Sequence, residues 1–110
     1  MGRKITPLVV LGASADGLEV FRKFFLSTPP ASGFAYIVLA QLSPCHISIL
    51  PELLQIKTGM KVVPIKSEIK INPNSVYVIP PNKILFLENQ YLFLYKFNQN
   101  LIYLLSQKYC

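Results

Sequence analysis

The run from Leu8 to Glu19 constrains the fold more than any other part of this chain. An apolar, β-branched stretch ends at Gly12, Ser14 follows closely, and apolar residues then recur at helical spacing. This order predicts a buried strand that turns directly into a helix. Such a turn lifts its side chain clear of the sheet and aims the free N–H groups of the helix start at the same point. Ser14 is therefore a candidate nucleophile, although serine is equally a favoured helix N-cap.

The alternation of strand and helix continues along the first part of the chain. Apolar runs bounded by Pro and Gly predict strands, and apolar residues at helical spacing predict helices. The predicted strands lie near residues 7–12, 35–41 and 61–65, and the predicted helices lie near residues 15–28 and 45–57. This β-α-β-α-β order is typical of a parallel sheet with right-handed crossovers.

The pattern changes after this core. A shorter strand is predicted at 75–79, and it is stopped by Pro80-Pro81-Asn82. Apolar runs at 84–88 and 91–95 flank a polar turn and predict an antiparallel hairpin. The predicted fold class is therefore α/β, with a mostly parallel Rossmann-like sheet, flanking helices and an antiparallel hairpin.

Composition narrows the function classes. The chain has 110 residues, which predicts one small domain. With 52% hydrophobic and only 15% charged residues, the composition fits either a domain with part of its surface normally covered or a compositionally biased genome. The net charge of +6 is scattered rather than gathered into a stripe, which argues against a nucleic-acid partner. Two cysteines, Cys45 and Cys110, form no disulfide framework, and no secretory signal or membrane span is evident, so a cytoplasmic location is expected.

Three motifs in order carry a family resemblance. They are Gly12-Ala13-Ser14-Ala15-Asp16-Gly17-Leu18-Glu19, then Gln41-Leu42-Ser43-Pro44 with His46 and the run from Ser48 to Leu54, then Val76-Tyr77-Val78-Ile79-Pro80-Pro81-Asn82. Together they resemble the catalytic domain of the CheB family, the receptor-glutamate methylesterases of bacterial chemotaxis-type signalling. The likeness is strongest to the version fused to a CheR-type methyltransferase. It assigns residues 1–96 to the N-terminal part of the domain and leaves residues 97–110 as a divergent tail.

The resemblance implies a function and its partners. The family hydrolyses methyl esters of receptor glutamates with a serine, a histidine and an aspartate, and uses neither metal nor organic cofactor. The implied partners are the methylated cytoplasmic domain of a chemoreceptor and a CheR-type methyltransferase, without nucleic-acid binding or membrane insertion.

Carried over residue by residue, the catalytic positions are incomplete. Ser14 matches the nucleophile, but Gln41 occupies the position of the catalytic histidine. A glutamine amide has no pKa suited to a general base. The family's aspartate lies in a Gly-Met-Gly loop, and no such run occurs in these 110 residues. We therefore expect a truncated domain with little esterase activity; the alternative is a non-catalytic receptor-binding or regulatory module derived from it.

Other residues near these motifs have ordinary explanations. His46 follows Gln41 by five positions and is expected to be a surface histidine, not a replacement base. Cys45 is expected to be passive, and Asp16 complements the positive start of a helix. A phosphate-binding turn is disfavoured because no lysine stands at phosphate-loop spacing.

Overall fold

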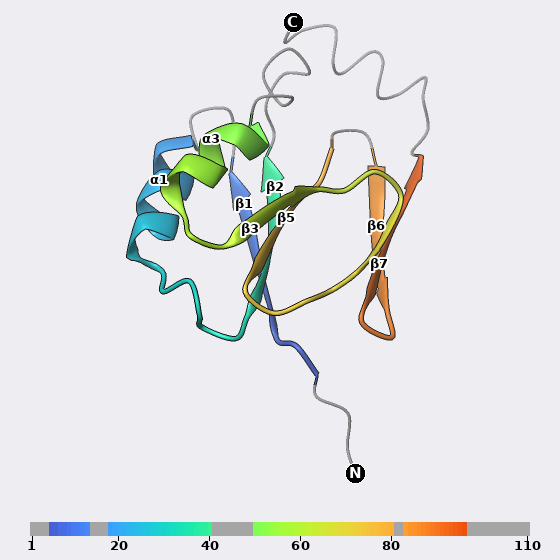
Figure 1. Ribbon diagram of the computed structural model, residues 1–110. Coiled ribbons are helices and arrows are strands. Elements are labelled where there is room, and N and C mark those ends of the chain that lie inside the picture. The colour runs from blue at the N-terminus through green and yellow to red at the C-terminus, as the bar shows by residue number, and fades with distance from the viewer. Residues whose placement is uncertain (1–4, 14–17, 41–49, 81–82, 97–110) are drawn as a thin grey trace, which may run out of the picture.

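Figure 1 shows the computed structural model, which describes residues 5–13, 18–40, 50–80 and 83–96. The described helices are α1 (Leu18–Ser27) and α3 (Leu50–Lys57). The described strands are β1 (Leu8–Ala13), β2 (Ala35–Ala40), β3 (Lys61–Pro64), β4 (Glu68–Lys70), β5 (Ser75–Val78), β6 (Lys83–Glu88) and β7 (Tyr91–Lys96). The predicted helix starts at residues 15–17 and 45–49 lie outside the described residues.

Four strands form a parallel sheet in the order β1-β2-β5-β3. β1 and β2 are paired along their full length, from Leu8 opposite Ala35 to Ala13 opposite Ala40. The parallel α/β fold predicted from sequence is therefore confirmed. One prediction is wrong: the sequence pattern places β5 after the parallel core, but this strand lies inside the sheet between β2 and β3. All four of its residues are buried, as a central parallel strand requires.

A second, antiparallel sheet has the order β4-β7-β6. The predicted hairpin is confirmed: β6 and β7 are joined by Asn89 and Gln90, both with positive φ (51° and 67°), as a two-residue hairpin turn requires. β4 is not predicted by any pattern in the sequence; it pairs with the side of β7 opposite β6. Its three residues include two charged ones and carry no apolar run, so only pairing with β7 defines them as a strand.

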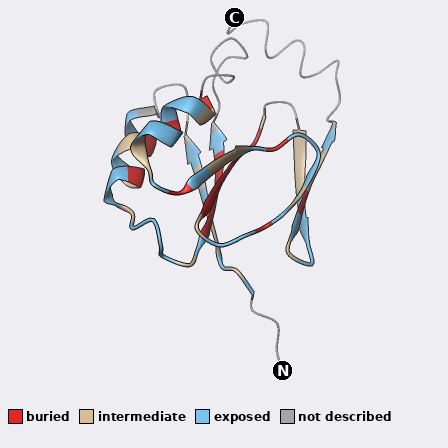
Figure 2. Ribbon diagram, in the orientation of Figure 1, coloured by how far each residue is buried: buried red, intermediate tan, exposed pale blue. Residues whose placement is uncertain are grey.

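The molecule has three layers. In Figure 1, α1 and α3 lie on one face of the parallel sheet and the β6–β7 hairpin lies on the other. The helix side is packed with aromatic and aliphatic side chains, including Phe21, Phe25 and Leu54. The hairpin side is packed around Ile37, Tyr77 and Leu92. Figure 2 shows that burial concentrates at the middle of the parallel sheet, so each face of that sheet supports its own core.

Candidate functional site

The carboxyl ends of β1 and β2 define the candidate site. These strands are parallel neighbours, and their last residues, Ala13 and Ala40, are register partners. The next residues in the chain are Ser14 and Gln41, which lie outside the described residues. Neighbouring strands are about 4.8 Å apart, so the chain leaves the sheet toward both candidate residues from adjacent points. Loops at the carboxyl ends of parallel strands are the usual place for a binding or catalytic site in this class of sheet.

Helix α1 begins at the same end of the sheet. It follows β1 after a short connection and runs back along the sheet, with Phe21 and Phe25 buried against it. The first four N–H groups of an α-helix have no partner within the helix. These groups and the helix dipole favour negative charge near the helix start, which suits an oxyanion formed during ester hydrolysis.

Glu19 is the described acidic residue closest in sequence to Ser14. The Arg22 side chain donates hydrogen bonds to Glu19 Oε2, with Nε at 2.7 Å. This contact holds the pKa of the Glu19 carboxyl below its ordinary value and raises the pKa of the Arg22 guanidinium, although both side chains are about half exposed to solvent. A carboxylate with a lowered pKa is a poor general base at neutral pH. This ion pair is not among the sequence predictions, although the i,i+3 spacing of its residues on a helix is a signal for it.

Gly12 lies one residue before the end of β1. A Cβ atom built there would meet Leu39 O at 3.7 Å, an ordinary van der Waals contact. The backbone at Gly12 has no positive φ that would demand glycine. Contacts among the described residues therefore do not explain why the smallest residue stands at this point of the strand.

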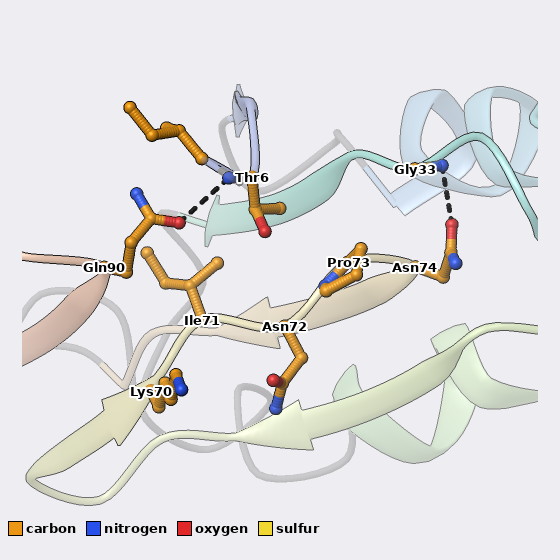
Figure 3. Close-up of a pocket in the computed structure, with 9 residues that line it drawn as sticks. Thr6, Gly33, Lys70, Ile71, Asn72, Pro73, Asn74 and Gln90 are labelled. Carbon is orange, nitrogen blue, oxygen red and sulfur yellow. Dashed lines mark hydrogen bonds between the residues drawn. The ribbon is translucent and has the colours of Figure 1, made fainter. Parts of the chain in front are cut away.

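A pocket of about 460 Å³ lies at the opposite end of the sheet (Figure 3). It is formed by segments that precede β1, β2 and β5 and by the hairpin turn. In it, Gln90 Oε1 accepts a hydrogen bond from Thr6 N at 2.9 Å, and Asn74 Oδ1 accepts one from Gly33 N at 2.7 Å. These bonds stabilise loops at the amino ends of the strands. Ala13 and Ala40, which precede Ser14 and Gln41, lie at the opposite, carboxyl ends.

The remaining sequence candidates are not placed. Asp16, Cys45, His46 and Cys110 lie outside the described residues. Within the described ranges, no group of three His, Cys, Asp or Glu residues lies close enough to hold a metal ion. No helix in the same ranges is long and apolar enough to cross a membrane.

Comparison with known families identifies the domain. The family model described as CheB methylesterase matches residues 9–107, nearly the whole chain. The chain belongs to the CheB methylesterase family. The match begins in β1 and includes both the Ser14 and the Gln41 positions.

The fold of the CheB family is also recognised in a solved structure. The crystal structure of the Thermotoga maritima CheB methylesterase catalytic domain superposes with a TM-score of 0.72 at 19% identity. The similarity covers 86% of this chain but only 51% of the Thermotoga maritima chain, so this protein spans about half of that domain. A search of curated proteins found no match.

Proposed function

We propose that this chain is the nucleophile-bearing part of a protein-glutamate methylesterase of chemotaxis-type signalling, with low activity of its own. Membership of the CheB family supports the reaction class, hydrolysis of a receptor glutamate methyl ester. Ser14 is the proposed nucleophile. The observation that carries the proposal is the register pair Ala13 and Ala40, which brings the chain to the nucleophile position and to the Gln41 position from neighbouring strand ends.

The proposed low activity rests on Gln41. An ester-cleaving serine needs a base that takes the hydroxyl proton during attack and later returns it to the leaving methoxide. Glutamine has an amide that neither gains nor loses a proton near neutral pH. Because the members of a catalytic triad act as a unit, loss of one lowers the rate by about 10⁴- to 10⁶-fold.

The proposed partners follow from the substrate. A methylated chemoreceptor cytoplasmic domain presents the ester, and a CheR-type methyltransferase is the enzyme class that makes it. Fusion to such a methyltransferase, a location in the bacterial cytoplasm and catalysis without metal or organic cofactor are parts of the same proposal.

A non-catalytic role is the second candidate, and one observation favours it. The chain keeps the CheB fold with a TM-score of 0.72, and by the family resemblance Gln41 stands where the base is expected. A domain of this kind can retain a receptor-binding surface after losing turnover. In that case the chain acts as a receptor-binding or regulatory module.

Methanol release from a methylated receptor cytoplasmic domain tests the first proposal. We expect release by the wild-type chain to be close to that of Ser14→Ala, and Gln41→His alone to restore little because the orienting carboxylate is absent from these residues. Ser14-dependent release at an ordinary enzymatic rate, about 1 s⁻¹ or more, would contradict the assigned impairment.

Receptor binding separates the two candidates. A binding module predicts association with the same receptor domain, measured by calorimetry, that survives Ser14→Ala. Loss of both binding and methanol release in the wild-type chain would reject the two candidates together.

A further inference from the structure

The pocket at the amino ends of the strands is built from four segments that hydrogen bonds hold together (Figure 3). The segment before β1, the loop before β2, the loop between β4 and β5 and the β6–β7 turn all line it. Besides the two side-chain bonds described above, Ile71 N donates to Gln90 O at 2.8 Å and Asn74 N donates to Phe34 O at 2.7 Å. The pocket therefore lies where the two sheets meet, and hydrogen bonds join its walls.

Two side-chain amides in the pocket have a defined orientation. A backbone N–H can donate only to the oxygen of an amide, so the bond from Thr6 N fixes the carbonyl oxygen of Gln90. The bond from Gly33 N fixes the carbonyl oxygen of Asn74 in the same way. The remaining group of each amide is NH2, which only donates hydrogen bonds. Both amides therefore present donors, and a ligand that meets them must supply acceptors.

The charge that lines the pocket is positive. Lys70 is an exposed lining residue, and none of the nine lining residues, all within the described part of the chain, is acidic. Glu68 lies two positions away on β4. Glu88 lies two strands away in register, about 10 Å, because both it and Lys70 stand opposite Tyr91. No ion pair joins Lys70 to either of these described carboxylates.

The cation and one of the oriented amides lie at the same end of the pocket. Lys70 is followed by Ile71, whose N–H donates to Gln90 O, so Lys70 and Gln90 are close neighbours. Apolar surface continues from this end: Ile71 is buried, and Ile5 and Pro73 also line the pocket. The volume of about 460 Å³ is within the range of about 300–1,000 Å³ that is typical of small-molecule sites.

We propose that this pocket binds a small organic monocarboxylate. Its carboxylate lies at the Lys70–Gln90 end and accepts from the ammonium and the amide NH2, and its apolar body lies over Ile5 and Ile71. Hydrogen bonds to an ionised acceptor are about twice as strong as neutral ones. One lysine balances one negative charge, whereas a phosphate group carries about −1.5 to −2 at pH 7. This site is separate from the Ser14 position and does not rest on the proposed hydrolysis.

Titration of the full chain with hexanoate, followed by the backbone amide signals in NMR spectra, tests the proposal. We expect saturable shifts at Thr6, Gly33 and Ile71, which line the pocket, and little change at Ala13 and Ala40, at the opposite ends of β1 and β2. Hexanamide has the same shape without the charge and should bind about tenfold more weakly or worse. Inorganic phosphate should also bind more weakly than hexanoate.

Two substitutions in the pocket have matched controls elsewhere. Lys70→Met removes the cation and should weaken hexanoate binding by about tenfold or more. Lys66→Met changes an exposed lysine outside the pocket and should leave the affinity within about twofold. Gln90→Glu keeps an oxygen for Thr6 N but replaces the NH2 donor by a charged oxygen, so it should weaken binding as Lys70→Met does. Gln55→Glu makes the same charge change on α3, across the parallel sheet from the hairpin, and should leave binding within about twofold.

Several results would overturn the proposal. They are the absence of saturable shifts, equal binding of hexanamide and hexanoate, equal binding by Lys70→Met and Lys66→Met, and shifts that gather at Ala13 and Ala40. Phosphate binding as tight as that of hexanoate would make a phosphate the ligand and reject the monocarboxylate. Lys70→Met alters an exposed side chain, so it decides the question even if Gln90→Glu lowers Tm. Methanol release plays no part in this test, so its failure and that of the proposed function are distinguishable.

Discussion

The hydrogen bonds of Gln55 allow a direct test of what stabilises β3, the strand at one edge of the parallel sheet. Its side chain leaves α3 and bonds twice to the neighbouring β3 segment, accepting from Val62 N at 3.0 Å and donating to Met60 O at 2.8 Å. Gln55→Met keeps the length and helix propensity of the side chain and removes these bonds, together with a longer one from Gln55 Nε2 to Thr58 O at 3.5 Å. Gln55→Glu keeps an acceptor for Val62 and loses the donor to Met60.

The size of the effect follows from the exposure of the two bonds. A typical hydrogen bond contributes about 0.5–1.5 kcal/mol net, and water partly replaces the bond at the exposed Val62 N–H, so Gln55→Met should cost about 1–2 kcal/mol. For a domain of this size that loss lowers Tm by about 4–8 °C. Gln55→Glu should lose about half as much.

Thermal unfolding followed by circular dichroism measures the change in Tm. The rate of amide hydrogen exchange at Val62 reports directly on the bond between Val62 N and Gln55 Oε1. Ile56→Met is the matched control, because that neighbouring side chain is 73% exposed and makes no comparable bond. If Gln55→Met and Ile56→Met give the same Tm and the same Val62 exchange rate, the Gln55 bonds do not protect this edge and the reasoning is wrong.

The remaining predictions concern the core, one buried hydroxyl and one ion pair. Leu54→Ala should lower the free energy of unfolding in urea by about 2–5 kcal/mol, because removal of this buried side chain leaves a cavity between α3 and the sheet. A decrease of less than about 1 kcal/mol would mean that neighbouring side chains fill the cavity. Tyr77→Phe should cost about 1–2 kcal/mol, because the buried hydroxyl accepts from Asn72 N and donates to Lys70 O; an unchanged midpoint would show that water replaces it. Glu19→Gln should lower Tm slightly at pH 7, because the lowered pKa of Glu19 marks stability that is present above the unfolded value of 4.5 and lost as pH falls through the folded pKa. The difference from wild type should therefore close in acid, and a gap that persists there would reject the ionic cause.

Local patterns in the sequence determined most of the elements. Apolar runs bounded by proline and glycine were enough to predict β1, β2 and β3, because buried parallel strands need continuous apolar residues. The two-residue turn of the β6–β7 hairpin was equally visible, since polar residues separate two apolar runs. The motifs around Ser14 and Gln41 also sufficed to indicate the CheB family, which the family match confirms.

Tertiary structure alone decided the order and the edges of the sheet. β5 resembles other short apolar strands, and its central place is set by pairing with β2 and β3 on both sides. β4 is a strand only because its backbone pairs with β7. The bond from Val62 N to Gln55 Oε1 joins β3 to α3, and no local pattern in the sequence connects these two residues. Sequence periodicity indicates which face of a strand is buried, but hydrogen bonding between distant segments determines which strands are neighbours.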